Sequence, residues 1–142
     1  MSLPPAVVVH GWAHARAALA PGLPLTLLST PGAALYAGCG WWAALAARAR
    51  SERPDLPVAD ILDCADASGY AMAALRIGQR MLLLTSRAPG RAAVVAAAAE
   101  LGSVVLATRP AALDMADRNA GGRLLAWLRE TRPPDDLSPP LG

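Results

Sequence analysis

The stretch RMLLLTSRAPGRAAVVAAAAELGSVVLA, residues 80–107, decides the fold class. Met81 to Thr85 is an apolar run typical of a buried strand, and Arg91 to Leu101 is an Ala-rich helix with Gly102 directly after its end. Ser103 to Ala107 is a second short apolar run with adjacent valines. A strand, a helix and another strand in this order predict two parallel strands joined by a crossover helix.

The same order of strand and helix repeats toward the N-terminus. Apolar runs predict further strands at residues 6–10, 25–29 and 58–64, and helices at 12–20, at 32–50 and from Asp66 or Ser68 to Gly78. Toward the C-terminus, Pro110 is typical of a helix start and predicts a helix to about Arg118. A last short helix is expected over residues 123–130.

These elements indicate one α/β domain over residues 1–131, with a parallel five-stranded sheet and helices on both faces, of flavodoxin-like or Rossmann-like type. The alternative is half of a (β/α)8 barrel. The open sheet is favoured because five strands cannot close an eight-stranded barrel. Residues 132–142, rich in Pro and Asp, are predicted to form a disordered tail that folding does not require.

Composition excludes several classes of function. All 13 basic residues are Arg, and the missing Lys is explained most simply by a GC-rich genome, which we take to be prokaryotic. Without Lys, Schiff-base chemistry, lysine-anchored pyridoxal phosphate and a Walker A loop are unavailable. A G-x-G-x-x-G turn is also absent, so no cofactor is predicted. The arginines are scattered without interleaved aromatic residues, which argues against nucleic-acid binding.

The chain is expected to be cytoplasmic and not to bind a membrane. Residues 17–47 carry no charge, but prolines and glycines interrupt them before a membrane-spanning length is reached. No secretory signal precedes Cys39 and Cys64, so both are expected to be reduced thiols.

Polar residues follow each predicted strand, at the edge where parallel α/β sheets bind their ligands. The catalytic candidates are His10 and Asp63, and the ligand-binding candidates are Ser29, Thr30, Asp66, Ser86, Arg87 and Arg109. Hydroxyls, guanidinium groups and nearby helix N-termini suit a small anion such as a phosphate or a carboxylate. The competing interpretation is that these residues only cap helices.

His10 is the first candidate for proton transfer, because imidazole can both accept and donate a proton near neutral pH. His14 follows four residues later, but Gly11 separates strand from helix and is expected to spoil a metal-binding spacing. A zinc site built from His10, Asp63 and Cys64 is conceivable, yet no C-x-x-C or H-E-x-x-H spacing is present, so no metal is predicted. Cys64 as a nucleophile is the minority interpretation, and a buried strand thiol is favoured.

The joint ALRIGQR, residues 74–80, lies within residues 66–84 and leads into an apolar strand. It resembles the helix-to-strand joints of (β/α)8 aldolases and phosphate-binding barrels over less than a fifth of the chain. The resemblance implies a phosphate or carboxylate site at the strand ends. The Schiff-base lysine of such aldolases has no counterpart here.

Gly38 and Gly40 are small where helix formers are preferred and predict a close approach of another backbone. Trp41 and Trp42 follow, and since adjacent helical residues point about 100° apart, one ring is expected to face a partner, a cleft or the domain edge. With 54% hydrophobic and 17% charged residues, the chain is expected to form a homo-oligomer through residues 38–47. Two functions therefore remain open, a small-anion binding protein and a non-catalytic assembly module.

Overall fold

The computed structural model describes residues 2–130, so the predicted tail at 132–142 lies outside the described residues. The strands are β1 (Ala6–Val8), β2 (Leu25–Leu28), β3 (Val58–Asp63), β4 (Met81–Leu83), β5 (Val104–Leu106) and β6 (Ala112–Asp114). The helices are α1 (Trp12–Leu19), α2 (Ala33–Tyr36), α3 (Cys39–Glu52), α4 (Ser68–Arg76), α5 (Arg91–Leu101) and α6 (Ala120–Arg129).

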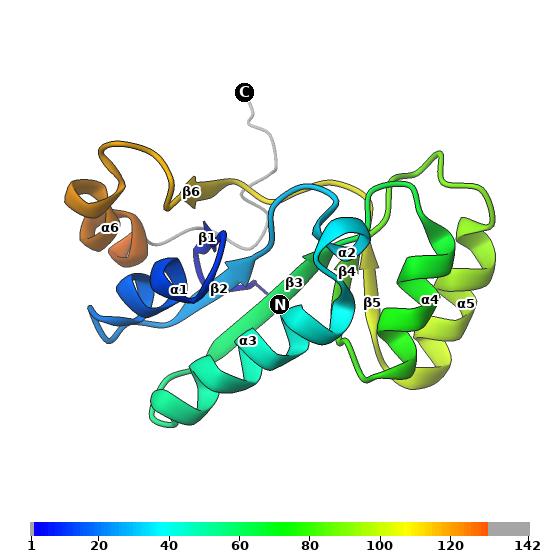
Figure 1. Cartoon of the computed structure of the whole chain (residues 1–142), viewed down its shortest axis with the longest axis horizontal. Helices are drawn as coiled ribbons and strands as arrows, with labels where there is room; N and C mark the ends of the chain where they lie inside the picture. Colours follow the sequence, from blue (N-terminus) through cyan, green and yellow to red (C-terminus); the bar gives the residue numbers. More distant parts are fainter. Residues whose placement is uncertain (1, 131–142) are drawn as a thin grey trace.

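The strands form one parallel sheet in the order β5-β4-β3-β2-β1-β6 (Figure 1). The α/β class and the five predicted strands are confirmed. The helix predicted from Pro110 to Arg118 is wrong, because Ala112–Asp114 pairs with Ala6–Val8 as a sixth strand within the described residues. An Ala-rich segment after a proline has helical propensity, but pairing with an edge strand overrides it.

The helices of the described chain gather over one face of the sheet, which corrects the prediction of helices on both faces. Every helix contributes buried side chains to one large apolar cluster, together with alternate strand residues such as Val7, Leu27 and Leu82. The residues next to them, including Val8, Leu28 and Leu83, form a smaller cluster of strand residues on the other face. Consecutive neighbouring strands with helices on one side are the arrangement of the half-barrel alternative.

The connection from β5 to β6, residues 107–111, crosses the face opposite the helices (Figure 1). Strands β1 to β5 follow one another across the sheet, whereas this connection returns in the reverse direction, past β1 to β6. A right-handed crossover in the reverse direction must pass over the face that the helices do not cover. In a flat sheet the two strands would stand about 24 Å apart. The backbone from Leu106 to Ala112 can span only about 21 Å. The sheet must therefore curl, as barrel strands do.

The single helix predicted over residues 32–50 is two helices. Gly38 separates α2 from α3 with φ 94° and ψ 150°, a conformation that is nearly exclusive to glycine. A Cβ at Gly38 or Gly40 would meet no atom within 4 Å, so the predicted close approach of another backbone is wrong. Glycine is required at position 38 by the positive φ of the backbone between the two helices.

The two adjacent tryptophans differ in burial, as expected. Trp42 is fully buried under α3, whereas Trp41 is exposed. No helix of the described residues is long and apolar enough to cross a membrane.

Candidate functional site

The carboxyl ends of β1 and β6 bring His10 and Asp114 together. His10 Nε2 lies 2.8 Å from Asp114 Oδ1, although the two residues are 104 positions apart in the sequence. Both side chains remain accessible, at 42% and 39% exposed. The backbone N–H of His10 donates to His14 Nδ1 at 3.1 Å, and the two imidazole rings meet edge to face. His10 therefore contacts two ionisable side chains.

The Asp114 carboxylate is suited to accept a hydrogen bond from His10. Burial acts to raise the pKa of Asp114, but the Ala116 N–H and the His10 ring outweigh it and hold the pKa below its ordinary value. An ionised Asp114 requires the proton of neutral His10 to lie on Nε2. The Nδ1 atom of His10 is then the ring atom available to a ligand.

Asp63 ends β3 in the same kind of turn, but its oxygens are occupied. Oδ1 accepts the backbone N–H groups of Gly32 at 3.1 Å and Ala65 at 2.8 Å. Oδ2 accepts Arg109 Nη1 at 2.6 Å, from the segment that crosses the sheet. The structure brings Asp63 to Arg109 and gives Asp114, which the sequence analysis missed, as the carboxylate partner of His10.

Ser29 completes the cluster around Asp63. Its Oγ accepts the Asp63 N–H at 2.9 Å and donates to the Thr30 carbonyl at 3.1 Å, while its own carbonyl accepts Arg109 Nη2 at 3.1 Å. Three predicted site residues, Ser29, Asp63 and Arg109, are thus adjacent. Their polar atoms already hold the ends of β2 and β3 to the crossing segment.

The remaining predicted ligand-binding residues lie at the same edge with few contacts. The Thr30 hydroxyl bonds the Tyr36 hydroxyl. Asp66, Ser86 and Arg87 are exposed, and none has a side-chain hydrogen bond or ion pair within the described residues. The helix-capping interpretation fails for them, because no helix in residues 2–130 has a side-chain hydrogen bond at its N-cap.

Cys64 lies at this edge as a buried thiol. Burial raises the pKa of Cys64 to about 12, and the nearby Asp63 charge acts in the same direction. Such a thiol is protonated and unreactive near neutral pH. His10 and His14 do meet, contrary to the expected spoiled spacing, but the described residues hold no group of three metal-binding side chains.

A repeat in the sequence contains the signal that would have found Asp114. Residues 61–66 read ILDCAD and residues 112–117 read ALDMAD, so Leu-Asp-x-Ala-Asp occurs twice. In both copies the first aspartate ends a strand and accepts the N–H of the residue two positions later, Ala65 or Ala116. The repeat therefore marks two equivalent strand ends.

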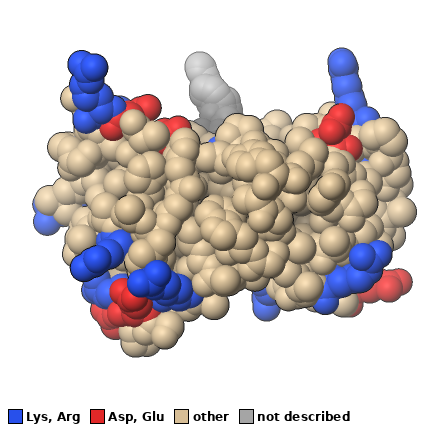
Figure 2. Space-filling view, viewed as in Figure 1, with Lys and Arg blue, Asp and Glu red and all other residues tan. Residues whose placement is uncertain are grey.

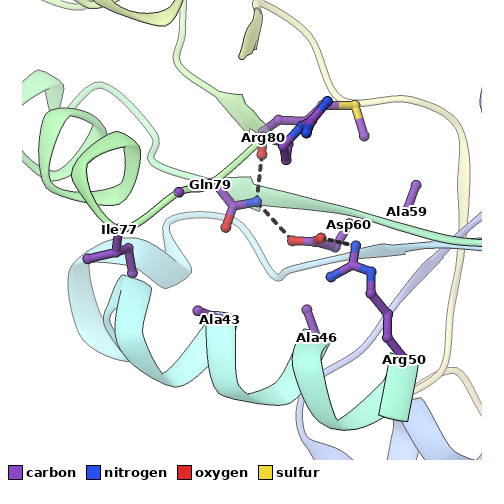
Figure 3. Close-up of a pocket in the computed structure, with 10 residues that line it drawn as sticks. Ala43, Ala46, Arg50, Ala59, Asp60, Ile77, Gln79 and Arg80 are labelled. Carbon is purple, nitrogen blue, oxygen red and sulfur yellow. Dashed lines mark hydrogen bonds and ion pairs between the residues drawn. The ribbon is translucent and has the colours of Figure 1, made fainter. Parts of the chain in front are cut away.

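A second polar cluster lies at the opposite, amino edge of the sheet. The Asp60 carboxylate is buried and accepts Trp42 Nε1 at 2.8 Å, Gln79 Nε2 at 2.8 Å and Arg50 Nη2 at 2.5 Å. Asp60, Gln79 and Arg50 line a cavity of about 410 Å³ between α3 and the turn before β4 (Figure 3). In the sequence, Asp60 only interrupts the apolar run of β3, and no local pattern indicates that it lines a cavity.

Comparison with known proteins gives a structural likeness only. No family model and no curated protein matches the chain. A crystal structure from Coccidioides immitis, provisionally described as a fructose-1,6-biphosphate aldolase, aligns over 73% of this chain with a TM-score of 0.54 and 20% identity. The alignment covers 40% of that protein, so this chain spans less than half of its length. At this identity the likeness shows the fold alone, and it agrees with a half barrel.

Proposed function

We propose that this protein binds a small anionic ligand, a phosphate or a carboxylate, at the carboxyl edge of its sheet, with His10 as the group that transfers or shares a proton. The observation that carries the proposal is the 2.8 Å contact between His10 Nε2 and Asp114 Oδ1. A structural histidine is usually buried among its partners, but this pair is accessible from solvent.

The start of α1 supports an anion beside His10. The first N–H groups of a helix have no intrahelical partner, and the N-cap residue Gly11 supplies no side chain to occupy them. Unbonded N–H groups at a helix N-terminus favour negative charge. When His10 is protonated, its Nδ1–H adds a charge-assisted donor to the same place.

Arg87 is a more distant contributor. It follows β4, three strands from β1, which corresponds to about 14 Å across a flat sheet. A ligand that contacts both His10 and Arg87 must be an extended one, such as a sugar phosphate. The description of the structural neighbour names a substrate of that class, but the missing Lys excludes a Schiff-base aldolase mechanism in this chain.

The test is a thermal-shift and calorimetric titration with inorganic phosphate, citrate and glycerol 3-phosphate, because a ligand that binds the native state raises its apparent stability. His10→Ala and Asp114→Asn should each weaken binding by about 1 to 3 kcal/mol. Asp117→Asn removes an exposed carboxylate from the same turn and is the matched control. Equal affinity in all three variants would refute the assignment.

The second candidate is an assembly module, and the surface charge supports it. Figure 2 shows that the middle of the helical face, over α2, the start of α3 and α4, carries no charged side chain. Exposed Leu35, Tyr36, Trp41 and Tyr70 belong to these elements. Apolar residues gathered on an uncharged face are typical of protein interfaces.

A further inference from the structure

The cavity at the amino edge of the sheet lies away from the His10–Asp114 pair, and the proposed function does not use it. Its volume of about 410 Å³ is in the range of small-molecule sites. Much of the wall is apolar, and the polar lining consists of Arg50, Asp60, Gln79 and Arg80. The polar members decide what the cavity can recognise.

Gln79 presents its carboxamide oxygen to the cavity. Nε2 of Gln79 donates to Asp60 Oδ2 and to the Met81 carbonyl, both at 2.8 Å. Since both of these partners can only accept, the NH2 group must face them, and the orientation of the amide is fixed. Oε1 is therefore turned away from Asp60 and toward α3, as Figure 3 shows.

This oxygen is a buried acceptor without a protein partner. Gln79 is 5% exposed, and no described residue donates to its Oε1. A buried polar atom without a hydrogen bond is costly, and nearly all such atoms in native proteins are satisfied by protein, water or ligand. The Gln79 oxygen thus marks a position for an O–H or N–H donor inside the cavity.

The charge of the lining is positive by one unit. Arg50 and Asp60 form an ion pair and neutralise one another. Arg80 is exposed and has no ion pair within the described residues. Figure 3 shows its long side chain directed away from α3, so the side chain must turn toward the cavity to meet an anionic group of a molecule bound there.

We propose that this cavity is a second ligand site, which takes a small organic anion with an apolar body and one O–H or N–H donor. The donor bonds Gln79 Oε1, the body lies against Ala43 and Ala46, and the anionic group pairs with Arg80. Specificity comes from the buried acceptor, because a molecule without the donor leaves it unpaired.

The chain offers a direct spectroscopic test with para-hydroxybenzoate as the probe. Gln79 is its only Gln and Asn119 its only Asn, so the side-chain NH2 region of a ¹⁵N–¹H spectrum contains two pairs of signals. Titration into the full chain should shift the Gln79 pair saturably and leave the Asn119 pair in place. Benzoate, which lacks the hydroxyl donor, should bind about tenfold more weakly.

Two matched pairs of variants locate the site. Ala43→Met fills the cavity and should abolish the shift, whereas Ala44→Met, at the adjacent exposed position of α3, should not. Arg80→Gln should weaken binding about tenfold, as expected for a charge-assisted contact. Arg76→Gln makes the same charge change on α4 outside the cavity and should leave affinity unchanged. The dispersion of the backbone N–H signals in the same spectrum reports whether each variant remains folded.

Absence of a Gln79 shift with para-hydroxybenzoate at millimolar concentration would overturn the proposal. So would a shift that survives Ala43→Met in a folded variant. Inorganic phosphate that alone produces the same saturable shift would overturn the ligand class, because it has no apolar body.

Discussion

Asp63 and Asp114 end β3 and β6 in equivalent turns, yet only one of the two carboxylates remains accessible. Asp63 is 8% exposed and holds Arg109, whereas Asp114 is 39% exposed and holds His10. The two residues share the turn that the Leu-Asp-x-Ala-Asp repeat specifies. Their different partners come from the neighbouring strands, so equivalent local sequence holds an arginine at one strand end and the candidate histidine at the other.

The first prediction concerns the Asp63–Arg109 pair. Arg109→Met should lower the free energy of unfolding by about 2 kcal/mol, because it leaves a buried carboxylate without its cation. This value is below that of a fully buried pair, since Arg109 is partly exposed. Urea denaturation measures the loss. Arg118→Met, at an exposed position, is the control, and equal stability of the two variants would contradict the structural role of the pair.

The second prediction concerns Cys64. Its pKa of about 12 means that iodoacetamide should leave Cys64 unmodified in the native protein at pH 8, while the partly buried Cys39 reacts faster. Peptide mapping by mass spectrometry distinguishes the two sites, and both should react in urea. Because the folded thiol keeps its proton where the unfolded thiol loses it, stability should also fall as pH rises from about 9 toward 12. Rapid native labelling of Cys64 would be incompatible with this account.

At the scale of helices and strands, the sequence predicts those elements whose residues show a clear hydrophobic pattern. Continuous apolar runs identify five strands, and α5 begins and ends at the predicted residues, Arg91 and Leu101. The short β6 is missed because three residues are too few to show periodicity, and only pairing with β1 makes them a strand. Assigning Asp114 to a helix also concealed the carboxylate partner of His10.

The break between α2 and α3 provides the third prediction, a pair of substitutions with opposite effects. Gly38→Ala should destabilise the protein by about 1 to 3 kcal/mol, because its φ of 94° is unfavourable for any residue with a Cβ. Gly40→Ala lies within the first turn of α3, where space is free, and should stabilise by about 0.5 to 1 kcal/mol. Thermal denaturation of both variants measures the effects. Destabilisation of similar size at both positions would mean that packing, and not backbone conformation, selects these glycines.

At the scale of the whole molecule, composition predicts an apolar chain but not where its apolar surface lies. The alternation of strand residues sends Leu27 and Leu82 toward the helices and Leu28 and Leu83 to the other face. No single strand reveals that the helices share one face, because this depends on the order of strands in the sheet. The amino-edge cavity was unpredictable for the same reason, since Asp60 and Gln79 meet only after β3 and β4 pair.

The last prediction is self-association through the uncharged helical face. Tyr36, Trp41 and Tyr70 are exposed there, and monomeric proteins rarely leave such residues gathered in water. Sedimentation at micromolar concentration should give twice the monomer mass of 14.6 kDa. Trp41→Arg should shift the equilibrium to monomer, because a charge at the centre of an apolar interface is strongly disfavoured. Leu125→Arg makes the same kind of change at an exposed position of α6, outside this face, and should leave the dimer intact. A single species of 14.6 kDa in the unmodified protein would exclude the assembly function and leave the strand-end site as the remaining candidate.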